Sequence, residues 1–138
     1  MLETKVVVEQ LPVGGNDNLE RRIFSEKGEM AQILNRTHEA FKNLVYWELD
    51  SARTGQERGH HYHERSTERF YVLTGELELS LKDIESLASK RLKVKAGNRV
   101  IISPRVAHAF RSLMYSQVLE YSPDPYDPTD TTPYKVAI

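Results

Sequence analysis

The chain has 138 residues, the length of one domain, and its hydrophobic content of 39% is enough to form a single core. Nineteen basic and twenty acidic residues give a net charge of −1, which favours neither nucleic acid nor an anionic membrane as a partner. The absence of cysteine excludes disulfide scaffolds, cysteine nucleophiles and thiolate metal sites. Because no apolar run reaches the length of a membrane span, we expect a cytoplasmic protein.

Short runs in which apolar and polar residues alternate predict an all-β protein. Residues 5–8 read as a first strand, while 16–43 are ambiguous, and 29–34 within them fit either a strand or a single helical turn. From residue 44 onward, alternating runs follow one another at 44–49, 60–63, 68–73, 76–81, 91–94, 100–102, 108–113 and 117–121. Turn signals separate several of these runs. This spacing predicts an antiparallel sandwich or barrel.

The last part of the chain is rich in proline and cannot form a helix. Four of the six prolines lie there, at Pro123, Pro125, Pro128 and Pro133, and each ring removes a backbone donor and restricts the preceding residue to extended conformations. We therefore expect a single domain at 1–121 followed by an extended tail at 122–138. The tail could be a flexible terminus or an arm that crosses the domain or a partner subunit.

Four of the five histidines predict a metal site. On a strand, His61 and His63 point to one face and His60 to the other. A hairpin can return Glu68 beside the two imidazoles, and His108 would supply a fourth ligand. This nitrogen and oxygen donor set suits a divalent transition metal (Fe, Mn, Co, Ni, Cu or Zn), whereas calcium and magnesium prefer oxygen ligands.

The spacing of these residues resembles the cupin superfamily. The first motif matches at every position, with Gly55 before His61 and His63, then Glu68, then Gly75. The second motif is looser. It runs from Gly97 to His108, with Ser103 in place of the usual proline, Arg105 in place of the usual glycine, and Ser112 where asparagine is frequent.

The two motifs span residues 55–112, and the resemblance implies an antiparallel double-sheet jelly-roll β-barrel with a metal bound inside it. Because Arg105 replaces a glycine, we expect a different turn before His108. A weaker likeness, carried by residues 58–63, 68–76 and 126–131, is to small cupins associated with polysaccharide and sugar-nucleotide modification. Sugar 3,5-epimerases of related fold work without a metal, and the complete ligand set argues against that mechanism in this chain.

Several further residues are candidates for catalysis or substrate binding. Tyr46 and Glu48 share one face of their strand, where they could line a cavity or face solvent, and Glu120 is a third candidate acid or base. By alternation from the metal ligands, Phe70 and Phe110 would face the metal side, either as cavity walls or as ordinary core residues. Arginines near the motifs could bind a substrate carboxylate or phosphate; they are Arg58, Arg105 and Arg111.

The sequence thus predicts a metal-binding protein, expected to be a homodimer, that acts on a small polyoxygenated molecule. Isomerase or epimerase chemistry on a sugar or sugar derivative is our first hypothesis, because a metal in such a site can polarise a carbonyl while a nearby acid moves a proton. An iron-dependent dioxygenase would use the same ligands. A non-catalytic module that binds or senses a sugar is the third interpretation.

Overall fold

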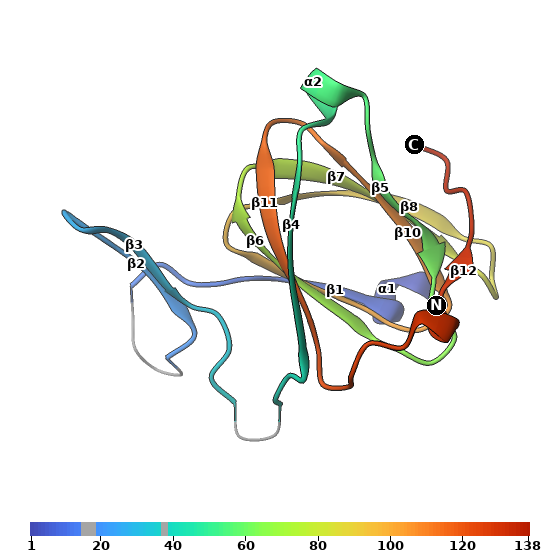
Figure 1. The fold of residues 1–138 in the computed structure, drawn as a ribbon, viewed down its shortest axis with the longest axis horizontal. Helices are drawn as coiled ribbons and strands as arrows, with labels where there is room; N and C mark the ends of the chain where they lie inside the picture. The colour runs from blue at the N-terminus through green and yellow to red at the C-terminus, as the bar shows by residue number, and fades with distance from the viewer. Residues whose placement is uncertain (15–18, 37–38) are drawn as a thin grey trace.

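The computed structural model describes residues 1–14, 19–36 and 39–138, and it consists mainly of antiparallel strands (Figure 1). Five strands form a first sheet in the order β1-β9-β6-β11-β4. Their bounds are β1 Val6–Gln10, β4 Asn43–Leu49, β6 Glu68–Thr74, β9 Asn98–Ile102 and β11 Ser116–Ser122. The predicted all-β fold class is confirmed.

A second five-stranded sheet has the order β12-β5-β10-β7-β8. Its strands are β5 Arg58–Tyr62, β7 Glu76–Asp83, β8 Ser89–Lys95, β10 Val106–Ser112 and β12 Thr132–Pro133. The described ranges also contain three short helical segments: α1 Leu2–Lys5 before the first strand, α2 Ser51–Thr54 between β4 and β5, and the 3-10 turn η1 Pro128–Asp130 between β11 and β12. No helix in the described ranges is long and apolar enough to cross a membrane.

The main core lies between the two sheets. Its buried side chains alternate along the strands with outward-facing residues, as expected for two sheets that each bury one face. Trp47, Phe70 and Phe110 form its aromatic part, with ring centroids 5.3 Å apart for Trp47 and Phe110 and 5.1 Å apart for the two phenylalanines. The aromatic contacts fix the wall of the interior beside the histidines.

The ambiguous region of the sequence contains a third, two-stranded sheet. Strands β2 Arg21–Ser25 and β3 Gly28–Gln32 pair as an antiparallel hairpin that projects from the two large sheets in Figure 1. Of the two interpretations of residues 29–34, the strand is therefore the correct one for residues 29–32. Residues 15–18 and 37–38 of this region lie outside the described ranges.

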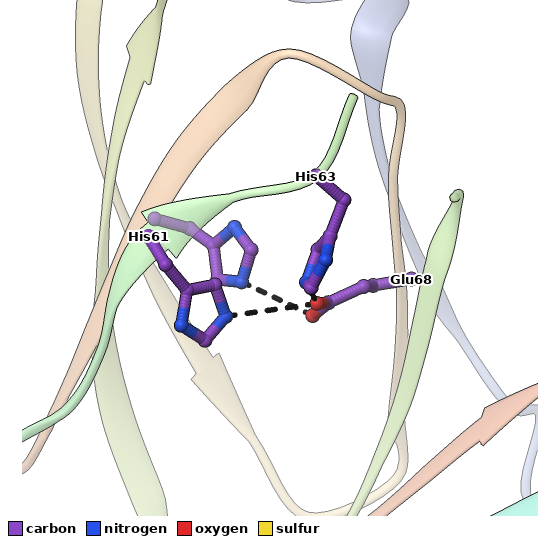
Figure 2. Close-up of side chains that lie close together, drawn as sticks. His61, His63 and Glu68 are labelled. Carbon is purple, nitrogen blue, oxygen red and sulfur yellow. Dashed lines mark ion pairs between the residues drawn. The ribbon is translucent and has the colours of Figure 1, made fainter. Parts of the chain in front are cut away.

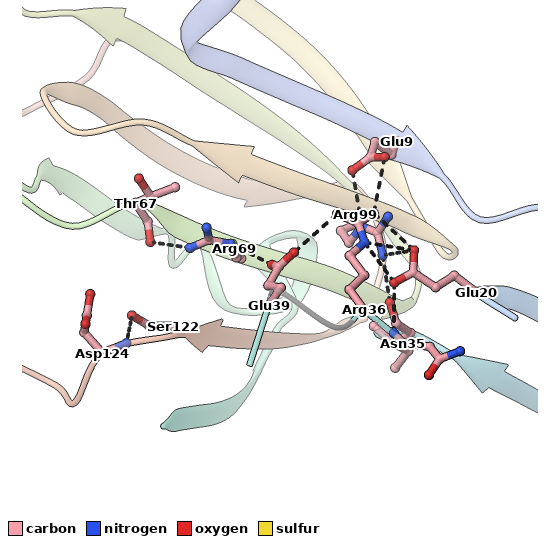
Figure 3. Close-up of polar contacts among 11 residues, drawn as sticks. Glu9, Glu20, Asn35, Arg36, Glu39, Thr67, Arg69, Arg99, Ser122 and Asp124 are labelled. Atoms are coloured by element: carbon pink, nitrogen blue, oxygen red, sulfur yellow. Dashed lines mark hydrogen bonds and ion pairs between the residues drawn. The ribbon is translucent and has the colours of Figure 1, made fainter. Parts of the chain in front are cut away.

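Buried charges join this amino-terminal segment to the outer face of the first sheet (Figure 3). Arg99 of β9 is only 3% exposed and its guanidinium forms ion pairs with Glu20 at 3.1 Å and Glu9 at 3.3 Å. Arg36 binds the same Glu20 carboxylate at 3.0 Å. Since a buried arginine without its carboxylate is strongly destabilising, the network holds the segment in place.

The carboxy-terminal tail packs against the outer face of the second sheet. Strand β12 pairs with β5, placing Thr132 opposite Tyr62 and Pro133 opposite His61. Val136 is 4% exposed and joins the small buried alanines of β10 in a second apolar cluster. Of the two interpretations of the tail, the arm that crosses the domain agrees with the structure.

Candidate functional site

Four side chains from three strands and their connections converge inside the molecule. They are His61, His63, Glu68 and His108, and one donor atom from each lies within 4.8 Å of the others. Figure 2 shows the imidazoles of His61 and His63 directed at the Glu68 carboxylate. His61 lies on β5, His63 directly follows that strand, and Glu68 opens β6. The predicted set of metal ligands is therefore brought together in space.

A bulge in β5 places His61 opposite His108. The register between β5 and β10 shifts at this point, pairing His61 with His108 and Gly59 with Ala109. Both Gly59 and His60 have positive φ angles, of 98° and 59°. At Gly59 a Cβ atom would lie 2.6 Å from the His108 carbonyl oxygen, so this position requires glycine.

The turn before His108 contains an arginine in a strained backbone conformation. Arg105 has a φ of 62°, the left-handed conformation that glycine favours. The Arg105 N–H donates to the His63 carbonyl at 2.7 Å and its guanidinium pairs with Glu64 at 3.0 Å. These contacts stabilise the unfavourable backbone conformation.

Backbone carbonyls orient two of the imidazoles. His63 Nδ1 lies 2.6 Å from the Asp130 carbonyl oxygen and His108 Nδ1 lies 3.1 Å from that of Val106. A carbonyl only accepts hydrogen bonds, so each Nδ1 carries a proton, and in the neutral ring each Nε2 presents its lone pair to Glu68. His63 Nε2 is buried with no hydrogen-bond partner among the described residues. A proton or a metal cation between these nitrogens and the carboxylate removes their repulsion, and three imidazoles with one carboxylate are a donor set that fits a divalent transition metal.

The electrostatics of the site agree with this geometry. Glu68 is 8% exposed, and burial favours its protonated form, but the nearby imidazoles, His108 above all, hold its pKa far below the ordinary range. Burial likewise disfavours a charged His108, yet the Glu68 carboxylate outweighs burial and raises the pKa of His108. The cluster therefore stabilises a positive charge beside an ionised carboxylate.

The ligand cluster borders a cavity of about 520 Å³ that also contains Glu120. Glu120 lies on β11 opposite Val45 of β4, and the Trp47 indole N–H donates to its Oε1 at 3.3 Å. Burial, together with the negative charge of Glu68, raises the pKa of Glu120 to about 7. A carboxyl group with this pKa can both accept and release a proton near neutral pH.

The other two candidate acids lie at the rim of the cavity. Tyr46 and Glu48 point away from the core, and they are joined to Tyr115 and Gln117 on the outer face of the first sheet. Tyr115 donates to the Glu48 carboxylate at 2.5 Å, and this bond raises the pKa of Tyr115. Of the three candidates, only Glu120 belongs to the interior face.

The predicted substrate-binding residues occupy the wall and the mouth of the cavity. Phe70 and Phe110 are each 2% exposed and line its wall as part of the core. The Arg58 guanidinium lies 5.4 Å from the Trp47 ring centroid and its Nε donates to the Glu48 carbonyl at 3.0 Å. Arg58 forms no ion pair with a carboxylate in the described part of the chain. Arg105, by contrast, is engaged by Glu64.

Two residues beside the site carry no motif that could have identified them. Trp47 has the alternation of a core residue, and only the pairing of β4 with β11 places its indole against Glu120. Asp130 lies in the proline-rich tail and reaches the His63 ring through its backbone. The proline and acidic composition of the tail predicts its extended conformation but not its contact with the site.

The sequence of residues 24–122 matches the polysaccharide biosynthesis C-terminal domain family. A search of curated proteins found no match. Solved structures share the fold at low sequence identity. A dTDP sugar isomerase from Desulfovibrio desulfuricans G20 has a TM-score of 0.76 at 15% identity, with 94% of this chain and 83% of that chain covered.

Two other similar structures are sugar-nucleotide enzymes. The sugar 3,4-ketoisomerase QdtA from Thermoanaerobacterium thermosaccharolyticum, in complex with TDP, has a TM-score of 0.72 at 18% identity over 93% of this chain and 87% of that one. The dTDP-6-deoxy-D-glucose-3,5-epimerase RmlC from Legionella pneumophila has a TM-score of 0.66 at 16% identity, with 91% of this chain and 76% of that chain covered. With its cupin fold and a family match over most of its length, the chain belongs to the polysaccharide biosynthesis C-terminal domain family.

Proposed function

We propose that this protein is a metal-dependent isomerase or epimerase that acts on a nucleotide-linked sugar. One observation carries the proposal: His61, His108 and the Glu68 carboxylate line the same cavity as Glu120, whose pKa is raised to about 7, and His63 completes the cluster of ligands. Such a cavity combines a site for a divalent cation with a group able to transfer a proton. The similar folds of sugar-nucleotide isomerases and epimerases support the choice of substrate class.

The mouth of the cavity has the chemistry to bind the nucleotide part of such a substrate. Arg58 is held by the Glu48 carbonyl through Nε only, which leaves its terminal nitrogens available to a phosphate group. Its position over the Trp47 ring limits the motion of the guanidinium. The cavity volume of about 520 Å³ lies in the range of small-molecule sites.

The proton transfer is assigned to Glu120. When bound by His61, His63, Glu68 and His108, a divalent metal would act as a Lewis acid toward a carbonyl or hydroxyl oxygen of the sugar. Ionised Glu120 would remove a proton from the hydroxyl-bearing carbon beside the carbonyl, with the C–H electron pair moving toward the carbonyl oxygen to give an enediolate. Return of that proton from Glu120 to the former carbonyl carbon, with transfer of the hydroxyl proton from the first oxygen to the other, completes an isomerisation. Trp47 would keep the carboxylate in place by its hydrogen bond.

Deuterium incorporation tests the proposal. TDP-4-keto-6-deoxyglucose, the ligand of one QdtA structure, is incubated in D₂O with protein loaded with Zn²⁺, Mn²⁺, Co²⁺, Ni²⁺ or Fe²⁺ and followed by NMR. We expect deuterium on a carbon beside the keto group, and exchange at least about a hundredfold slower in Glu120→Gln. Glu48→Gln at the rim is the matched control and should keep most of the rate.

Other outcomes would contradict the proposal. Absence of exchange with every metal, together with oxygen consumption by the iron-loaded protein, would indicate the dioxygenase. Tight sugar-nucleotide binding with neither exchange nor oxygen consumption would indicate a binding or sensing module. Full exchange in the metal-free protein would show that the metal is not required.

A further inference from the structure

The proline-rich tail makes direct contacts with the strand that carries the histidines. Beyond the pairing of β12 with β5, the Tyr134 N–H donates to the His60 carbonyl at 2.8 Å and the Val136 N–H donates to His60 Nδ1 at 3.1 Å. The tail therefore holds the edge of β5 that does not pair with β10, next to His61. A tail segment bound at this place can influence the geometry of the ligands.

Asp130 makes the most extensive of these contacts. Its side chain is 3% exposed and accepts four hydrogen bonds from the loop that joins His63 to Glu68. Oδ1 accepts from the backbone N–H groups of Glu64 at 3.0 Å and Arg65 at 3.2 Å. Oδ2 accepts from the N–H of Ser66 at 3.0 Å and from its hydroxyl at 2.7 Å.

The same residue also orients a metal ligand directly. The carbonyl oxygen of Asp130 accepts the hydrogen bond from His63 Nδ1 at 2.6 Å, which leaves Nε2 directed at Glu68. Partners of this kind fix the tautomer and the ring plane of a ligating histidine. Asp130 thus holds the connection between two ligands with its side chain and sets one of them with its backbone.

We propose that Asp130 is a positioning residue of the metal centre, through which the carboxy-terminal tail sets the spacing of His63 and Glu68. The inference rests on the proposed function, because it concerns the same four ligands. It extends the site to a residue far from the motifs in sequence. If the Asp130 carboxylate is lost, the backbone N–H groups of residues 64–66 lose their acceptor. The loop between His63 and Glu68 would then change its conformation to pair these groups.

The test is a metal titration of the full chain with Co²⁺, followed by its visible absorption. Asp130→Asn keeps the size of the side chain but replaces one acceptor oxygen with an amide NH₂ group that faces donors. We expect the dissociation constant to rise by about 10- to 100-fold, the usual effect of losing such a partner. We also expect the imidazole nitrogen NMR shifts of His63 in the metal-free variant to show loss of the single Nδ1–H tautomer.

Asp127→Asn is the matched control. Asp127 belongs to the same 3-10 turn but is exposed and bonds to Thr129 and to the Arg65 side chain instead of the loop backbone. We expect it to change the dissociation constant by no more than about twofold, as is usual for an exposed ionic contact. If Asp130→Asn does not fold, Ser66→Ala replaces it. That variant removes one of the four hydrogen bonds and should weaken Co²⁺ binding more than Asp127→Asn does.

The outcomes separate this inference from the proposed function. If His61→Ala abolishes Co²⁺ binding while Asp130→Asn binds as tightly as the wild type, the positioning role is wrong and the metal centre stands. A lower melting temperature of metal-free Asp130→Asn with an unchanged dissociation constant and tautomer would likewise show a purely structural role. If His61→Ala binds Co²⁺ as tightly as the wild type, the metal centre itself is wrong.

Discussion

Replacement of Glu120 by glutamine should stabilise the metal-free protein at neutral and alkaline pH. Burial and the charge of Glu68 raise the pKa of Glu120 from its ordinary value of 4.5 to about 7. At 1.36 kcal/mol per pH unit this displacement corresponds to about 3 kcal/mol. Because the side chain keeps some contact with solvent, we expect about 2 kcal/mol.

The sign of the effect follows from proton linkage. The folded state binds the Glu120 proton more tightly than the unfolded state, so the wild type loses stability as the pH rises from about 4.5 to about 7. Glu120→Gln has no proton to lose at this position. The two proteins should therefore be equally stable at pH 4.5 and differ by the full amount above pH 7.

Urea denaturation at pH 4.5, 6, 7 and 8 in the presence of EDTA measures the difference. The chelator removes any metal that would favour the ionised carboxylate. Titrating groups that do not interact with Glu120 cancel in the comparison, whereas loss of the Glu120 charge also lowers the pKa of His108. A difference in the free energy of unfolding that does not change with pH would refute the reasoning, as would a variant less stable than the wild type at pH 8.

Three further predictions concern the ligands and their support. His61→Ala should abolish metal retention whereas His60→Ala should keep it, as measured by elemental analysis; retention in the first variant would contradict the assignment. Metal affinity should fall as the pH drops, and the fall should begin above the ordinary histidine pKa of 6.5, because imidazole ligands must be neutral and Glu68 raises the pKa of His108. A dissociation constant for Co²⁺ that does not change between pH 5 and 8 would contradict this. Gly59→Ala should lower the free energy of unfolding by about 2–4 kcal/mol, because the new Cβ meets the His108 carbonyl oxygen. Gly28 is also at positive φ but has open space around it, so Gly28→Ala should lower the free energy of unfolding by only about 1–2 kcal/mol through backbone strain. An equal loss in both variants in urea denaturation would show that the contact between the new Cβ and the His108 carbonyl oxygen is unimportant.

Strand alternation explains why the ligand set was predictable. His61, His63 and Glu68 are close in sequence, and the period of two in an extended backbone predicts both histidines on one face, although His63 lies just past the end of β5. The same argument identified Phe70 and Phe110 as residues of the metal side. It also predicted the strands between residues 44 and 121, where turn signals separate several of the apolar runs.

Local patterns could not decide the features that depend on pairing between distant strands. Tyr46, Glu48 and Glu120 were equivalent candidates until the register of β4 with β11 placed Glu120 on the interior face. Arg105 stands where glycine is usual, and a hydrogen bond to the carbonyl of the distant His63 holds it in a left-handed conformation. These outcomes follow from long-range contacts that no local window contains.

The sequence by itself therefore determined the fold class and the four groups that can bind a cation, because both depend on the alternation of side chains along strands and on the spacing of a few residues. The tertiary structure alone decided which acid enters the cavity and what holds the ligands in place. The tail illustrates the reason: its prolines impose an extended backbone, but only packing against β5 and β10 brings Asp130 to the loop beside His63.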